Sequence, residues 1–105
     1  MANRNYANGA ALERRVGRRY EEKGWDVTRV AGSHSPKDLV CCRAGDTTLY
    51  VQVKGNRSGG PFKDFGPAAR RSLAETAERA GAQPLLIWRT PQNTLRFLDK
   101  EAWPK

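Results

Sequence analysis

The stretch from Asp38 to Lys54, DLVCCRAGDTTLYVQVK, decides the fold of this chain. Two β-prone runs flank a short turn that contains Gly45, which is the pattern of a β-hairpin. If the hairpin is centred on Gly45, Asp38 lies opposite Gln52, and opposed residues of an antiparallel pair share a face. Strand alternation puts Gln52 and Lys54 on that same face. An acid, an amide and an ammonium group are therefore expected to converge at the open end of the hairpin.

Helices and further strands are predicted on both sides of this hairpin. Leu12, Val16 and Tyr20 recur every four positions, which indicates a helix over residues 9–23 that ends at Gly24 in the C′ position. The other expected segments are a polar arm at 1–8, strands at 25–30, 84–88 and 95–98, a helix at 67–80, and loops at 31–37 and 55–66. The order α-β-β-β-α-β-β predicts a single α/β domain over residues 1–105, with a mixed central sheet flanked by helices.

The composition is that of a basic, globular chain. Its 105 residues include 19 Lys and Arg against 11 Asp and Glu, which gives a net charge of +8. Each third of the chain carries a positive excess, so the folded body is basic and not only a tail. This imbalance favours a polyanionic partner, and a merely well-solvated surface is the competing interpretation.

The sequence also bears on compartment and on the state of its cysteines. No apolar run approaches the roughly 20 residues that span a bilayer, and the first six residues lack the apolar core of a signal peptide. Cys41 and Cys42 are adjacent on a predicted strand, point to opposite faces, and are poorly placed to bridge each other. We therefore expect reduced cysteines, no membrane partner, and a cytoplasmic, intracellular location.

The polar groups at the hairpin's open end suit phosphodiester hydrolysis. A hard cation helps that reaction because it neutralises developing charge and lowers the pKa of a water, and oxygen ligands hold Mg²⁺. Asp38, the amide oxygen of Gln52 and the main-chain carbonyl of Val53 can supply such ligands. Lys54 can orient the attacking water and stabilise charge on the phosphate. Glu13, which borders the buried stripe of the first helix, can complete the site.

Each of these residues also has a structural interpretation. Asp38 can cap a turn, Lys54 can be a surface charge at a strand end, and Glu13 can pair with arginines of its own helix. His34, the only histidine, can contact a phosphate or transfer a proton, although most lone loop histidines do neither. The combination of hairpin, shared face, basic body and preceding acid favours the catalytic interpretation.

Several segments resemble the archaeal-type Holliday junction resolvases, which belong to the PD-(D/E)XK, or restriction-endonuclease-like, nuclease superfamily. The segments are NGAALER at 8–14, GWDVTRVAGS at 24–33, DLV at 38–40, VQVK at 51–54, GAQPLLI at 81–87 and LRFL at 95–98. The resemblance covers most of the chain. It implies a homodimer that binds four-way DNA junctions and nicks two strands symmetrically with Mg²⁺, for which Mn²⁺ can substitute.

The matching motif implies roles for individual residues. Glu13 is then the helix-borne acid, Asp38 the central metal ligand and Lys54 the motif lysine. These enzymes carry a serine in the loop before the central acid, and here Ser33 and Ser35 both qualify. The arm at 1–8 and a mobile loop at 55–66 are expected to contact DNA. The residues proposed for DNA binding are Arg4, Arg14, Arg18, Arg29, His34, Arg57 and Lys63.

Gln52 departs from the family pattern, which has a second acid at this position. A neutral amide is a weaker ligand for a hard dication than a carboxylate, so metal affinity should fall. Two functions are therefore weighed: a metal-dependent, structure-specific DNA endonuclease, and a non-catalytic or metal-weak DNA-binding module that retains the nuclease fold. For the expected dimer, an exposed aromatic ring at Phe62, Phe65 or Trp103 would supply the apolar contact.

Overall fold

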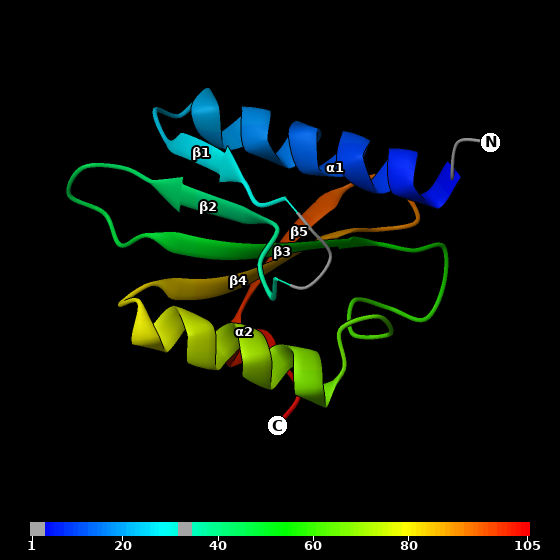
Figure 1. Cartoon of the computed structure of the whole chain (residues 1–105). Coiled ribbons are helices and arrows are strands. Elements are labelled where there is room, and N and C mark those ends of the chain that lie inside the picture. Colours follow the sequence, from blue (N-terminus) through cyan, green and yellow to red (C-terminus); the bar gives the residue numbers. More distant parts are fainter. Residues whose placement is uncertain (1–3, 32–34) are drawn as a thin grey trace.

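A five-stranded sheet separates two long helices in the computed structural model, which describes residues 4–31 and 35–105 (Figure 1). The elements in chain order are helix α1 (Arg4–Glu21), strands β1 (Asp26–Arg29), β2 (Leu39–Cys42) and β3 (Leu49–Gly55), helix α2 (Pro67–Arg79), strands β4 (Gln83–Arg89) and β5 (Leu95–Asp99), and a short 3₁₀ helix η1 (Lys100–Ala102). The predicted α/β order and the mixed sheet flanked by helices are confirmed.

The strands lie side by side in the order of the chain, β1 to β5. Only β3 and β4 are parallel, and α2 makes the crossover between them. In the β2–β3 hairpin, Leu39 pairs with Val51 and Cys41 with Leu49. This is the register that the sequence predicts. The pairing ends at Leu39, and the N–H of Asp38 donates to the carbonyl of Val51, so the predicted pairing of Asp38 with Gln52 is not formed. Gly45 has a φ of 82° in the connecting turn, a conformation that favours glycine.

Strand alternation divides the apolar side chains between two cores, one under each helix. On the α1 face, Val16 packs with Leu39 and Val51 of the hairpin. On the α2 face, Leu73 packs with Leu86 and the aromatic residues of the C-terminal half. Both faces of β3 and β4 are therefore covered, which fixes the register of the strands that carry the candidate site.

Helix α1 begins earlier than the sequence predicts. The polar residues 4–8 belong to the helix and not to an arm, because they contain neither proline nor an internal run of glycine that would break it. Its end is as predicted: Gly24 has a φ of 88° and donates its N–H to the carbonyl of Glu21 (3.0 Å), while Trp25 donates to Tyr20 (3.1 Å). Residues 1–3 lie outside the described chain.

Two arginine contacts hold α1 against the sheet. Arg15 donates from Nη1 to the side-chain oxygen of Asn93 (2.7 Å) and from Nη2 to its carbonyl (3.0 Å), in the turn between β4 and β5. Arg43, in the hairpin turn, donates to the carbonyl of Lys23 just past the helix (2.8 Å). The helix that carries Glu13 is thereby positioned relative to both hairpins.

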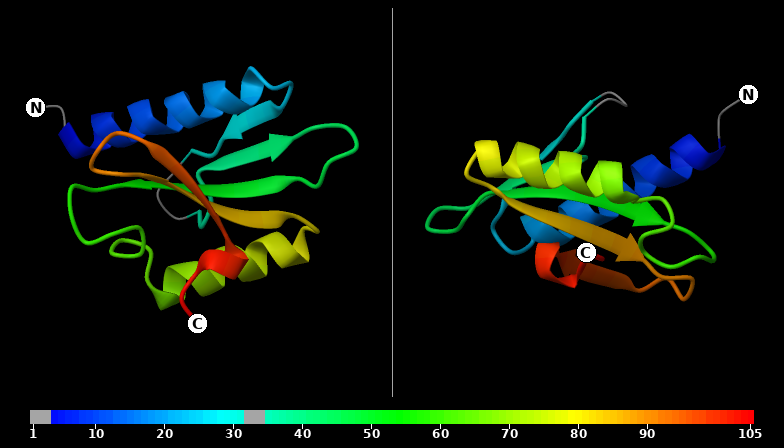
Figure 2. Two further views of the ribbon diagram at one scale, coloured as in Figure 1. Left: turned by 180° about the vertical axis from the view of Figure 1, so that it is seen from behind. Right: turned by 90° about the horizontal axis from the view of Figure 1, so that it is seen from below.

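The aromatic residues of the C-terminal half pack within their own chain. Phe65 is 1% exposed and Trp103 7%, and their rings meet edge to face at 5.1 Å. Trp103 also donates its indole N–H to the carbonyl of Leu98 (2.9 Å), because the segment after β5 folds back beside β4 and β5 (Figure 2). The prediction that Phe65 or Trp103 is exposed for a dimer contact is therefore wrong, and Phe62 is half-buried against the same cluster.

Two smaller expectations concern the membrane and the cysteines. No helix within residues 4–31 and 35–105 is both long and apolar enough to cross a bilayer. Cys41 is buried and Cys42 exposed, as strand alternation requires, and both are free thiols. Burial raises the pKa of the Cys41 thiol to about 12, which keeps it protonated and unreactive.

We expect Phe65→Ala to lower the free energy of unfolding by about 3–5 kcal/mol, because it empties a fully buried ring site. Urea denaturation followed by circular dichroism measures this loss. Phe97→Ala is the matched control, since that ring is 40% exposed and the same truncation should cost much less. A larger loss at Phe97 than at Phe65 would contradict this packing.

Candidate functional site

Asp38 lies at the point where β2 and β3 part. Its N–H donates to the carbonyl of Val51 (2.7 Å), and its carbonyl accepts from the N–H of Val30 (2.8 Å). Its Oδ2 accepts from the N–H of Val53 at 2.8 Å. The carboxylate thus occupies the place of the next main-chain acceptor along β2. The expectation that it stands on the face of Gln52 is corrected, because this bond directs it to the edge of β3.

The main-chain carbonyl of Val53 faces the same gap. In an extended strand, the N–H and C=O of one residue point to the same edge. Since the N–H of Val53 reaches Asp38, its carbonyl oxygen lies on the Asp38 side of β3. A neutral oxygen is therefore placed beside the carboxylate, as the predicted ligand set requires.

The surroundings of Asp38 disfavour the ionised form of its carboxyl group. The pKa of its carboxyl is raised from the ordinary 3.8 to about 6, mainly by burial and also by the charge of Glu13. The Val53 N–H bond, Lys54 and Arg29 act in the opposite direction. Glu13, Lys54 and Arg29 therefore all lie close enough to act on the charge of Asp38. A half-buried carboxylate with a raised pKa and such neighbours is a frequent feature of catalytic and metal sites.

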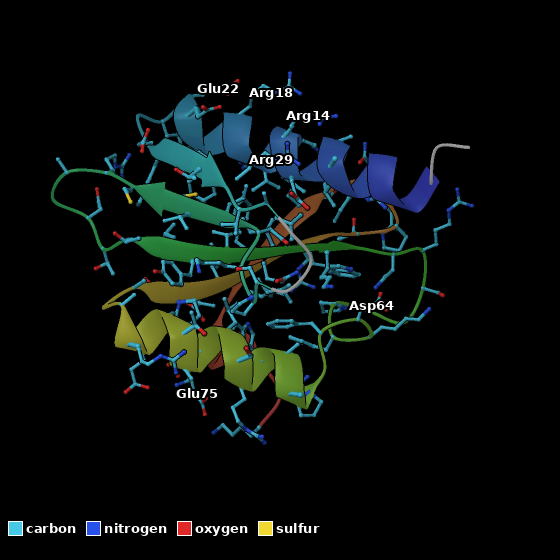
Figure 3. The ribbon with its side chains drawn as sticks, in the orientation of Figure 1. Arg14, Arg18, Glu22, Arg29, Asp64 and Glu75 are labelled. Carbon is cyan, nitrogen blue, oxygen red and sulfur yellow. The ribbon has the colours of Figure 1, made fainter. Side chains whose placement is uncertain are left out.

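Glu13 reaches the site from α1 and is paired with Arg29. The Nη2 of Arg29 lies 3.3 Å from the Oε1 of Glu13, and the two side chains are 44% and 23% exposed. Figure 3 shows Arg29 beneath α1, at the end of β1. The sequence suggested that Glu13 could pair with an arginine of its own helix. In the structure its partner is Arg29, which belongs to strand β1.

Gln52 and Lys54 approach from the opposite side of the sheet. Strand alternation puts both on the α2 face with Tyr50, and both are half-buried. Within the described ranges, neither side chain forms a hydrogen bond or an ion pair. The site is therefore built around the gap between β2 and β3, with Glu13 on one side and Lys54 on the other.

The donor set fits a hard divalent cation. Carboxylates of Glu13 and Asp38, the carbonyl of Val53 and the amide of Gln52 are all oxygen ligands, which Mg²⁺ and Mn²⁺ accept. No group of three Asp, Glu, His or Cys side chains that could hold a metal exists in the described part of the chain. A cation at this place would therefore depend on the neutral oxygens as well.

The loop before Asp38 is described only in part. The hydroxyl of Ser35 accepts from the N–H of Lys37 (3.3 Å), which closes the turn that leads to Asp38. Ser33 and His34, both predicted site residues, lie outside the described residues. The choice between the two serines thus stays a prediction.

An arginine-lined groove runs between α1 and β1 and ends at Glu13. Its volume is about 480 Å³. Three of the residues predicted to bind DNA line it, namely Arg14, Arg18 and Arg29 (Figure 3). Two acids, Glu13 and Glu21, also line it, so the groove is basic without being uniformly so.

The remaining predicted DNA contacts lie in two other places. Arg4 is the first residue of α1, and its side chain is not described. Arg57 and Lys63 belong to the loop after β3, whose second half is anchored by the buried ring of Phe65. The mobility of this loop stays a prediction.

Two basic residues beside the site are missing from the residues proposed on sequence grounds. Lys37, directly before Asp38, places its ammonium 4.6 Å from the centroid of the Tyr50 ring. Arg89, at the end of β4, covers Gly55, where an added Cβ would lie 3.0 Å from Nη2. Adjacency to the acid could have indicated Lys37, but the position of Arg89 follows only from the β3–β4 register.

A model of the archaeal Holliday junction resolvase (Hjc) family matches residues 4–103. Among solved structures, the chain is similar to Hjc from Archaeoglobus fulgidus, a Holliday junction resolvase from an archaeal hyperthermophile. The TM-score is 0.75 at 22% identity, over 93% of this chain and 77% of that chain, which shows a shared fold. A UPF0102 protein from Dinoroseobacter shibae is 45% identical over 53 residues. That match spans 49% of this chain and only 39% of the relative.

Asp38→Asn should stabilise the protein at neutral and alkaline pH. Because the folded-state pKa is raised, the stability linked to Asp38 is full below pH 3.8 and is lost as pH rises through about 6. We expect the variant to gain about 1–3 kcal/mol at about pH 8 and almost nothing at about pH 4. Thermal unfolding across this range measures the gain. Asp64→Asn, at an exposed position, is the control (Figure 3), and an equal gain there would refute the assignment.

Proposed function

The chain belongs to the archaeal Holliday junction resolvase family, and we propose that it is a metal-dependent endonuclease that hydrolyses phosphodiester bonds in four-way DNA junctions. The observation that carries this proposal is the half-buried carboxylate of Asp38, held by the N–H of Val53, with Glu13 and Lys54 on either side of it. The proposal includes membership of the PD-(D/E)XK superfamily, a single catalytic domain over residues 1–105, and a substrate of intracellular branched DNA.

The metal would be held by Glu13, Asp38, the carbonyl of Val53 and the amide oxygen of Gln52. When bound, Mg²⁺ or Mn²⁺ would neutralise charge on the scissile phosphate and lower the pKa of a water. The hydrogen bond from the N–H of Val53 would keep Asp38 oriented toward this place. The side chain of Lys54 has no hydrogen-bond or ion-pair partner in the described part of the chain. It would orient the attacking water and stabilise the charge that develops on the phosphate.

DNA would be held by the basic surface around this site. The groove of Arg14, Arg18 and Arg29 leads to Glu13, and guanidinium groups bind phosphate oxygens in pairs. Arg57, Lys63 and the rest of the loop after β3 would contact the DNA on the other side of the gap. Such contacts position the substrate without reading its sequence, as recognition of a junction by its shape requires.

Gln52 supports a second candidate function, a DNA-binding module that keeps the fold but binds metal weakly or not at all. With Gln52 neutral, the metal site lacks one of the charges that carboxylates supply. The module would still bind DNA through its net charge of +8, with a steep dependence on salt.

Cleavage of defined DNA substrates separates these two functions. We expect a four-way junction to be nicked with Mg²⁺ or Mn²⁺, faster than a flap or a linear duplex of the same sequence. Lys54→Ala should slow the cleavage step by a factor of about 10²–10³, the usual loss for a group that stabilises transition-state charge. Lys100→Ala, at an exposed position on η1, should not. Junction binding without cleavage at any metal concentration would favour the second function.

A homodimer is also proposed, on the family resemblance. The buried Phe65 and Trp103 cannot supply its apolar contact, whereas Phe97 is a large apolar side chain that is exposed in the described part of the chain. Light scattering should give a mass near twice 11.7 kDa in the absence of DNA. A mass near 11.7 kDa at all accessible concentrations would exclude the dimer.

A further inference from the structure

Arg29 is fixed beside Asp38 by the main chain. It pairs with Leu39 at the end of β1, and the next residue, Val30, donates its N–H to the carbonyl of Asp38 (2.8 Å). The side chain lies on the α1 face, because Arg29 is two residues after Val27, which packs against that core, and residues i and i+2 of a strand share a face. From this anchored position it reaches Glu13 at 3.3 Å.

This contact leaves the site without an excess of negative charge. The charged groups that act on Asp38 are one further acid, Glu13, and two cations, Lys54 and Arg29. With Gln52 neutral, the two carboxylates are balanced by the two cations. The Oε1 of Glu13 moreover lies 3.3 Å from the Nη2 of Arg29, so a metal ion that binds this oxygen must compete with the guanidinium. In the absence of DNA, the protein's own guanidinium therefore competes for a metal ligand.

The ion pair between Glu13 and Arg29 is weak and lies where a phosphate could displace it. Both side chains are partly exposed, and ion pairs of this kind contribute little to stability. Arg29 lines the same groove as Arg14 and Arg18, so a phosphate in that groove would offer its guanidinium another acceptor. Breaking the Glu13 contact frees the carboxylate for the metal and the guanidinium for the phosphate in one exchange.

We propose that Arg29 is the internal counter-ion of Glu13, which metal and DNA phosphate displace together, so that the two ligands bind cooperatively. This inference rests on the proposed metal-dependent action on DNA. The DNA-free protein should therefore bind the metal weakly, and the complex with DNA should bind it more tightly. By linkage, DNA raises the metal affinity and the metal raises the DNA affinity by the same factor.

The test is calorimetric titration of the DNA-free protein with Mn²⁺, using single-residue variants. Arg29→Gln should bind Mn²⁺ roughly fivefold more tightly than the wild type, because the competitor for Glu13 is gone. Arg29→Lys keeps the charge and should remain near the wild type. Arg14→Gln is the matched control, since it removes one positive charge from the same groove without touching Glu13. Gln52→Glu should also tighten binding, by adding a carboxylate to the ligand set.

The second arm measures junction binding by fluorescence anisotropy, with and without Ca²⁺ in place of the catalytic metal. The wild type should bind DNA more tightly with the ion, and this gain should shrink in Arg29→Gln but not in Arg14→Gln. Unchanged Mn²⁺ affinity in Arg29→Gln, an equal rise in Arg14→Gln, or no Mn²⁺ binding even by Gln52→Glu would overturn the proposal. Tighter Mn²⁺ binding by Arg29→Gln without junction cleavage would uphold the exchange and reject only the nuclease function.

Discussion

The hydrogen bond from the N–H of Val53 to the Oδ2 of Asp38 is the contact on which the candidate site depends. It joins β2 to β3 beyond their last main-chain pair and replaces a ladder bond by a carboxylate. The carboxyl group of Asp38 is half-buried at the edge of a strand. This partial burial raises its pKa to about 6, although the bond from Val53 itself acts in the opposite direction. Because the folded protein disfavours the ionised form of Asp38, this residue lowers the stability of the folded state above about pH 6. Such a loss of stability is common at functional sites.

Side chains from both faces of the sheet reach the gap between β2 and β3. Glu13 comes from the helix on one face, while Gln52 and Lys54 belong to the other face, and Asp38 lies between them in the plane of the strands. Each side chain is held by an element whose register is set by burial, through Val16 and Leu39 on the α1 face and Leu86 on the α2 face. The elements that carry the site are therefore fixed by buried packing, whereas the ion pair between Glu13 and Arg29 is partly exposed.

The sequence predicted the fold more completely than the site. Periodicity and turn glycines predicted both α-helices and all five strands within a few residues, apart from the start of α1, where a polar but unbroken segment gives no signal. The short 3₁₀ helix η1 was not predicted. The aromatic residues after β3 and β5 showed the limit of this reasoning. Phe65 and Trp103 have no periodicity that marks them as buried, and only the return of the C-terminal segment across β4 and β5 covers them.

By itself, the sequence determined the hairpin register and with it the neighbourhood of Asp38, Gln52 and Lys54. This follows because a strand repeats every two residues and a slip would expose Leu39 and Val51. Only the tertiary structure decided the direction of the Asp38 carboxylate and the pairing of Glu13 with Arg29. Those contacts join a strand to a neighbouring strand and to a helix packed on its face. Their geometry depends on how closely the elements approach, which no local pattern in the sequence records.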